Sequence, residues 1–60
     1  MGNNIKEYRE NKKLSQQDLA RLLNISVNYL NKIERNKKEP SLRLAIRLAT
    51  ILECEVKDLF

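Results

Sequence analysis

Apolar residues recur along this chain at intervals of three and four. Leu19, Leu22 and Leu23 show this spacing, and Leu30 and Ile33 lie three apart on a later segment. Such intervals place side chains on one face of a helix. The pattern predicts an all-α protein of five short helices, over residues 3–12, 16–23, 27–35, 42–52 and 56–60. Sixty residues make a single domain, 1–60.

Residues 16–35 are predicted to form two helices joined by a tight corner. Ser15 precedes an acidic residue by three positions, which is the spacing of a capping box. Ser26 can cap the second helix in the same way. Between the helices, Asn24 tolerates the positive φ that a tight corner requires. The stretch therefore predicts a helix-turn-helix motif at the second and third helices.

The third predicted helix has two different faces. Its inner face carries Leu30, Ile33 and Glu34. Its outer face offers amides, cations and one apolar contact, through Val27, Asn28, Asn31, Lys32 and Arg35. Amides pair bidentately with adenine, lysine reaches guanine acceptors, and valine contacts the thymine methyl group. A solvated polar face is the alternative, but the corner that precedes this helix favours the interpretation as a DNA-reading surface.

The chain resembles the Cro/cI-type, or Xre-like, family of helix-turn-helix regulators. The resemblance rests on Leu14-Ser15-Gln16-Gln17-Asp18-Leu19-Ala20, Ile25-Ser26, Leu30, Ile33-Glu34-Arg35, Pro40-Ser41-Leu42, Leu48-Ala49, Leu52 and Asp58-Leu59-Phe60. It covers nearly the whole chain with almost no offset. It implies a lambda-repressor-like domain whose second and third helices form the DNA-binding motif.

Four positions depart from the family pattern, which commonly has glycine where this chain has Lys13, Asn24, Asn36 and Glu53. Asparagine keeps a left-handed backbone accessible. For lysine and glutamate the sequence leaves open whether the turns keep the same geometry.

The resemblance also implies an ion pair between Arg9 and Glu34. Glu34 shares the inner side of its helix with leucine and isoleucine, where an unpaired carboxylate is costly. In the family, an arginine at the position of Arg9 pairs with a glutamate at the position of Glu34. The pair is expected to tie the first helix to the recognition helix.

Charge is polarised along the chain. The formal net charge is +4 and the pI about 9.5, which favours a polyanionic partner. Residues 27–47 hold six cations and two acids, whereas residues 48–60 hold one cation and three acids. A generic solvated loop at 36–41 is the alternative to a phosphate-binding one. The candidate DNA-binding residues are Gln16, Ser26, Val27, Asn28, Tyr29, Asn31, Lys32, Arg35, Lys37, Lys38 and Arg43.

Residues 42–52 form a helix with an unusually wide apolar surface. Either this helix is central and wrapped by the others, or part of its surface is shared with a second chain. In related repressors the C-terminal helix region carries the dimer contact. The expected interface residues of a homodimer are Leu44, Ile51, Val56 and Phe60.

Catalysis and metal binding have no support in the sequence. The chain has no histidine, a single cysteine, no glycine-rich phosphate loop and no nucleophile–base pair. No metal site, internal disulfide or cofactor is expected, and Cys54 is expected to be a buried, inert thiol rather than an exposed or intermolecularly bonded one. No signal peptide or membrane-spanning run is seen, so a cytoplasmic protein is expected.

The predicted function is sequence-specific binding to double-stranded DNA and regulation of transcription. Repression by occlusion is the simplest output for a chain with no visible effector domain. One such domain reads too little DNA for high specificity, so a homodimer on a pseudo-palindromic operator is expected. Two alternatives stay open: a protein-interaction module, such as an antitoxin or partner-sequestering subunit, and a non-specific nucleic-acid binder.

Overall fold

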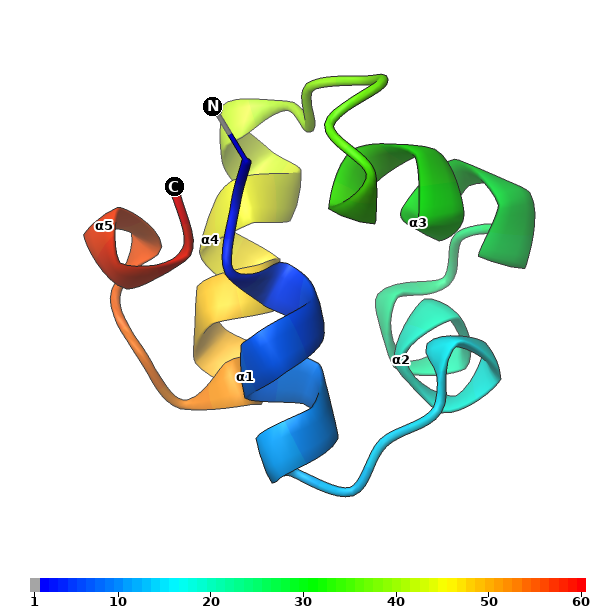
Figure 1. The fold of residues 1–60 in the computed structure, drawn as a ribbon, viewed down its shortest axis with the longest axis horizontal. Helices are drawn as coiled ribbons and strands as arrows, with labels where there is room; N and C mark the ends of the chain where they lie inside the picture. The colour runs from blue at the N-terminus through cyan, green and yellow to red at the C-terminus, as the bar shows by residue number, and fades with distance from the viewer. Residues whose placement is uncertain (1) are drawn as a thin grey trace.

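The structure, a computed structural model, describes residues 2–60, and this part of the chain folds into five helices with no strand. The helices are α1 (Ile5–Asn11), α2 (Gln16–Leu23), α3 (Val27–Glu34), α4 (Leu42–Leu52) and α5 (Val56–Leu59) (Figure 1). The all-α, five-helix prediction is confirmed. The second and fourth helices have the predicted bounds, and the other three are shorter by one to two residues at their ends.

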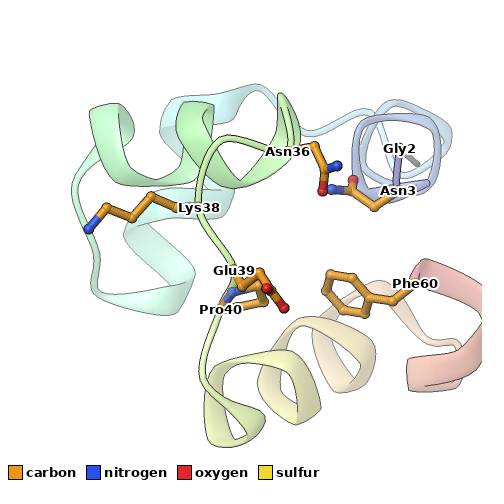
Figure 2. A pocket seen from close by; sticks show the side chains of 7 residues that line it. All are labelled: Gly2, Asn3, Asn36, Lys38, Glu39, Pro40 and Phe60. Carbon is orange, nitrogen blue, oxygen red and sulfur yellow. The ribbon is translucent and has the colours of Figure 1, made fainter.

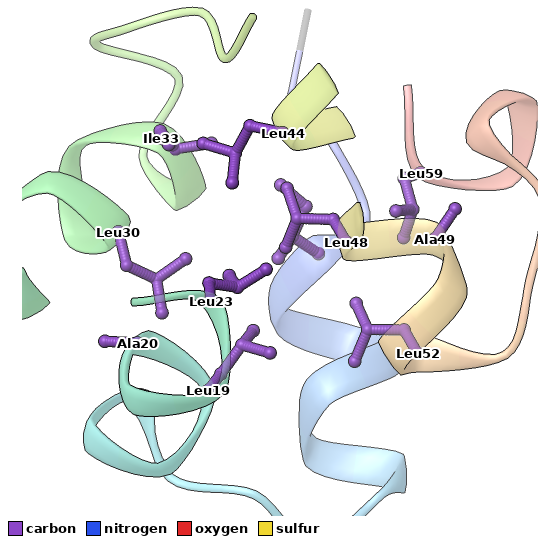
Figure 3. Close-up of a cluster of buried hydrophobic side chains, with 11 residues drawn as sticks. Leu19, Ala20, Leu23, Leu30, Ile33, Leu44, Leu48, Ala49, Leu52 and Leu59 are labelled. Atoms are coloured by element: carbon purple, nitrogen blue, oxygen red, sulfur yellow. The ribbon is translucent and has the colours of Figure 1, made fainter. Parts of the chain in front are cut away.

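The helices enclose one core, which α4 shares with α1, α2, α3 and α5. Figure 3 shows the buried side chains of α2, α3, α4 and α5 pointing into a common centre. Eight side chains are almost completely buried: Ile5, Leu19, Leu23, Leu30, Ile33, Leu48, Leu52 and Leu59. Truncating one buried leucine to alanine costs about 2–5 kcal/mol. A domain this small has little stability to spare, so such a truncation removes a large fraction of its free energy of unfolding.

Three serines cap three of the helices. The hydroxyl oxygens of Ser15, Ser26 and Ser41 accept hydrogen bonds from backbone N–H groups three residues on, at 3.0, 3.0 and 3.1 Å. The Asp18 carboxylate accepts in return from the Ser15 N–H at 3.0 Å, which completes the predicted capping box. These bonds satisfy N–H groups that a helix leaves without internal partners. They fix where α2, α3 and α4 begin.

All four positions where the family commonly has glycine adopt a left-handed backbone. The φ angles are 61° at Lys13, 59° at Asn24, 62° at Asn36 and 58° at Glu53. The turns therefore keep their left-handed geometry despite the side chains, including the lysine and the glutamate. Lys12, next to Lys13, forms an ion pair with Glu53 that links two of these turns.

The segment before α1 bonds to two other helix ends. The side-chain amide of Asn3 donates to the Ile33 carbonyl of α3 at 2.9 Å, and that of Asn4 donates to the Asp58 carbonyl of α5 at 3.0 Å. The Asn4 backbone N–H donates to the Leu59 carbonyl at 2.9 Å. These contacts explain why α1 begins at Ile5 and not at residue 3 as predicted.

The apolar residues of α4 that are exposed differ from those that the sequence pattern predicted to be exposed. Leu44 is only 7% exposed and packs in the core near Ile33 of α3 (Figure 3), so its placement at a dimer interface is corrected. Leu42 and Ile46 are instead 74% and 50% exposed. The sequence could not separate these residues, because a helix apolar on most sides does not reveal which sides its neighbours cover.

Candidate nucleic-acid interface

The short turn between α2 and α3 packs the third helix against the second. Ala20 of α2 is 2% exposed and Leu30 of α3 is fully buried, so the two helices meet through small and apolar side chains. The Ile25 N–H donates to the Ala20 carbonyl at 3.0 Å across the left-handed Asn24. Three residues, 24–26, therefore separate the two helices, as a helix-turn-helix requires.

The outer face of α3 is open from its first turn onward. Val27 is 37% exposed, Asn28 and Lys32 are exposed, and Asn31 is half-buried. Leu30 and Ile33 on the opposite face are fully buried. The structure therefore brings together four of the five side chains that the sequence placed on the outer face of this helix. The face presents two amides, one ammonium and one small apolar group, which are groups that recognise base edges.

Tyr29 occupies a different position from these four residues. It is half-buried and packs against the core, and its ring helps to line a small hollow between α3 and the first half of α4. Arg43, which is exposed in the first turn of α4, lines the same hollow. Tyr29 therefore lies beside the exposed face of α3 and not on it.

Gln16 is the half-buried member of a polar cluster at the junction of three helices. Its side-chain amide donates to Oε1 of Glu34 at 3.0 Å. Nε of Arg9 donates to Oε2 of Glu34 at 2.7 Å, and Nη1 of Arg9 donates to the Leu14 carbonyl at 2.9 Å. The carboxylate thus links α1, the start of α2 and the end of α3. Sequence patterns do not predict the Gln16–Glu34 bond, because the two residues are 18 positions apart.

A basic loop follows the exposed helix. Lys37 and Lys38 are exposed, and the Lys37 N–H donates to the Lys32 carbonyl at 2.8 Å, which holds the loop against the end of α3. Within residues 2–60, five cations around α3 and this loop form no ion pair: Lys32, Arg35, Lys37, Lys38 and Arg43. The side chains around α3 and this loop therefore carry positive charge that no acidic side chain of residues 2–60 neutralises through an ion pair.

A hollow of about 350 Å³ lies on the far side of the same loop. Figure 2 shows Phe60 facing Pro40 and Glu39 across it, with Asn3 and Asn36 at its edge. It lies beside the basic loop and apart from the exposed face of α3.

Residues 2–60 contain neither a metal-binding cluster nor a membrane-spanning helix. No three acidic, cysteine or histidine side chains there gather in a way that could hold a metal ion. None of the helices over residues 2–60 is long and apolar enough to span a membrane. Cys54 is half-buried, and burial raises the pKa of its thiol, which keeps it protonated near neutral pH.

Two residues that the sequence did not single out bind the ends of the motif helices. The guanidinium of Arg47 donates to carbonyls at the end of α2, and the amide of Asn3 donates to one at the end of α3. Their partners are backbone atoms, which carry no sequence signal, so only the folded arrangement reveals them.

These features define a class of protein. An all-α domain with a tight helix-turn-helix, an exposed polar second helix and an adjoining basic loop is the architecture of a DNA-binding domain. The helix-turn-helix family model HTH_3 matches residues 5–59. The chain therefore belongs to the helix-turn-helix family of the Cro/cI type. This is a family of DNA-binding transcriptional regulators and not of enzymes.

Individual relatives agree with this membership. An uncharacterized HTH-type transcriptional regulator of Methanocaldococcus jannaschii is 38% identical over 60 residues, which are 100% of this chain and 91% of the relative. The crystal structure of the restriction-modification controller protein C.AhdI from Aeromonas hydrophila is similar, with a TM-score of 0.85 and 37% identity over 95% of this chain and 86% of that one. The biofilm regulator SinR, solved in complex with DNA, gives a TM-score of 0.81 and 33% identity over 90% of this chain and 87% of that one.

Proposed function

We propose that this protein binds double-stranded DNA sequence-specifically by inserting the helix at residues 27–35, which contains α3, into the major groove. The observation that carries the proposal is the exposed face of α3, where two amides, an ammonium group and a valine lie together above a fully buried apolar face. The major groove admits an α-helix and presents a distinct pattern of donors and acceptors for each base pair.

Base contacts and backbone contacts fall to different residues in this proposal. Base edges are read by Val27, Asn28, Asn31 and Lys32. Phosphates on the two sides of the groove are held by Gln16, Ser26, Tyr29, Arg35, Lys37, Lys38 and Arg43. The unpaired cations support this division, because phosphate contacts supply affinity while base contacts supply specificity.

A homodimer on a pseudo-palindromic operator is the assembly that we propose. Two domains read two half-sites about one helical turn apart, which provides the specificity that one domain lacks. The exposed apolar residues Leu42, Ile46 and Phe60 are suited to contact a second copy, and Ile51 and Val56 are half-buried candidates for the same role. Leu44 supports the core beneath them and makes no part of this surface.

Binding of the dimer to its operator is the step that would regulate transcription. A dimer seated across a promoter excludes other proteins from the same groove, so repression is the output that we propose. The cytoplasm is the compartment that goes with this function.

A protein-interaction module is the second candidate. It is favoured by the same exposed leucine, isoleucine and phenylalanine, since a partner of another kind could cover them. A double variant, Leu42→Ser with Ile46→Ser, that retains DNA binding but loses a co-purifying protein would favour this reading.

Selection from a random duplex pool tests the proposed function. The purified protein is incubated with the pool at moderate salt, and retained duplexes are sequenced. Two enriched half-sites in inverted orientation are expected. The matched control is Asn28→Ala with Lys32→Ala, which should lose the enrichment while retaining salt-sensitive binding. Retention without an enriched sequence, or no retention, would contradict the proposal; the second outcome would favour the protein-interaction module.

A further inference from the structure

One arginine of α4 binds the C-terminal end of α2. Nη1 of Arg47 donates to the Leu23 carbonyl at 2.9 Å, and Nη2 donates to the Leu22 carbonyl at 3.3 Å. The two carbonyls belong to consecutive residues, so the planar guanidinium spans the end of the helix with both of its terminal nitrogens. Arg47 lies 24 positions after Leu23, on a helix that is not part of the helix-turn-helix.

The last four carbonyls of α2 are all satisfied once Arg47 is included. The backbone N–H groups of Ile25 and Asn24 reach the Ala20 and Arg21 carbonyls, at 3.0 and 3.1 Å. These bonds belong to the left-handed turn itself. The remaining two carbonyls have no N–H of the turn as donor, and Arg47 supplies both donors. Four such carbonyls without internal partners are a general property of helix ends.

The bound carbonyls lie directly before the corner that starts α3. Asn24 follows Leu23, and the base-reading face of α3 begins three residues later at Val27. The positive guanidinium also lies where the α2 dipole is negative, which favours the contact. Arg47 therefore fixes the end of α2, and with it the direction in which the corner directs the first turn of α3.

We propose that Arg47 is a positioning residue for DNA reading: by binding the α2 end from α4, it holds the corner so that Val27 and Asn28 meet base edges in the correct register. This inference rests on the proposed function of α3. This role differs from that of a phosphate-binding cation, because the partners of Arg47 are two protein carbonyls, one for each terminal nitrogen of the guanidinium.

Arg43 provides the matched comparison on the same helix. It is an exposed arginine of α4 and forms no ion pair within residues 2–60, and it is proposed to hold a phosphate. Replacing either arginine with methionine removes one charge and keeps an unbranched apolar stem. The two variants therefore separate a loss of positioning from a loss of charge.

The first measurement is amide hydrogen exchange on the free protein, below the unfolding temperature of each variant. In Arg47→Met, exchange at the Ile25 and Tyr29 amides is expected to accelerate about tenfold more than exchange at the Arg9 amide in α1. In the wild type, opening of the corner must break the two Arg47 hydrogen bonds, whereas in the variant these bonds are absent and opening costs less free energy. In Arg43→Met, the exchange rates at the corner amides and at the Arg9 amide should change by the same factor. Equal acceleration at the corner and in α1 of Arg47→Met would overturn the inference, whatever the protein does with DNA.

The second measurement is the ratio of affinities for the selected duplex and a scrambled one, as a function of salt. For Arg47→Met the ratio should fall about tenfold with an unchanged salt slope, as when one base contact is lost. Arg47→Lys, which can satisfy one carbonyl, should recover part of the ratio. For Arg43→Met both affinities should fall together and the salt slope should decrease by about one.

These outcomes distinguish a failure of the positioning role of Arg47 from a failure of the proposed DNA binding by α3. A wild-type protein without preference for any duplex would overturn the proposed function, while the exchange data would still decide whether Arg47 holds the corner. A wild-type preference that Arg47→Met retains in full would show that Arg47 contributes to stability alone and would overturn its positioning role.

Discussion

Arg9 and Glu34, which are 25 positions apart, join α1 to the end of α3 through two hydrogen bonds. Nε of Arg9 lies 2.7 Å from Oε2 of Glu34, and Nη2 lies 3.2 Å from Oε1. The two side chains are 8% and 3% exposed. The ion pair that the family resemblance implied is therefore present, and Gln16 completes it as a third member.

Removing one member of this pair should be costly. Glu34→Ala leaves the Arg9 guanidinium largely buried without its carboxylate, which costs about 3–5 kcal/mol. Urea unfolding at low temperature measures the loss. The control is Glu10→Ala, an exposed residue of α1, which should change stability by less than about 0.5 kcal/mol. An unchanged midpoint for Glu34→Ala would show that the pair does not hold α3 in place.

Glycine at a left-handed position should stabilise the fold. Lys13 has a φ of 61°, a conformation that costs an L-residue about 1–2 kcal/mol but glycine almost nothing. Part of the gain is offset by the greater freedom of glycine in the unfolded chain, so Lys13→Gly should gain about 0.5–1 kcal/mol. Thermal unfolding measures it. Lys13→Ala removes the same charge but keeps a Cβ at the left-handed position, so it should show no such gain in stability. Equal gains in stability for the two variants would show that the effect comes from the lost charge.

Acid should weaken the protein in a defined window. The Ser15 backbone N–H, and then the Ser15 hydroxyl, lower the pKa of Asp18 below 3.8, and the hydrogen bond and charge of Lys12 lower the pKa of Glu53 below 4.5. In both cases the unfolded chain binds the proton more readily, so the stability is present above the ordinary pKa and is lost as pH falls through the folded one.

Asp18→Asn tests this linkage. The variant should be less stable than wild type at neutral pH, and the difference should shrink as the pH falls below about 4. Urea midpoints between pH 3 and 7 measure it, and Glu53→Gln should behave in the same way at slightly higher pH. A difference between wild type and Asp18→Asn that stays constant over this range would contradict the assignment.

A base-reading residue and a phosphate-binding residue should respond differently to truncation. Asn28→Ala should cost about 1–3 kcal/mol on the selected duplex and relax the preference at one base pair. Lys38→Ala should weaken binding to all sequences alike and reduce the salt slope by about one. Titrations of selected and scrambled duplexes at several salt concentrations distinguish the two. Identical behaviour of both variants would rule out the proposed groove assignment.

Phe60 should matter for association more than for folding. The side chain is 50% exposed, so Phe60→Ser should leave the helical content unchanged while weakening a homodimer. Sedimentation equilibrium measures the change. Leu44→Ser is the contrasting variant, because its 7% exposed side chain packs in the core and its loss should unfold the domain. A monomer–dimer equilibrium identical to wild type would remove Phe60 from the interface.

Local patterns in the sequence were sufficient to locate most of the fold. Helix periodicity predicted five helices, and the serine caps and Asn24 fixed the ends of the motif helices, because these signals depend on neighbours within four residues. The outer face of α3 followed from the same periodicity. Lys13 and Glu53 could not be resolved in this way, since only the folded turns show that they accept a left-handed backbone.

Contacts between distant segments were decided by the tertiary structure alone. The bonds of Gln16 to Glu34, of Arg47 to the α2 carbonyls and of Asn3 to Ile33 join residues 18 to 30 positions apart, and two of the three involve backbone oxygens that every residue has. Packing also decided which apolar side of α4 is covered, so that Leu44 is buried while Leu42 is exposed. The sequence determined which helices form and which α3 face is polar; the tertiary structure determined how the corner is held.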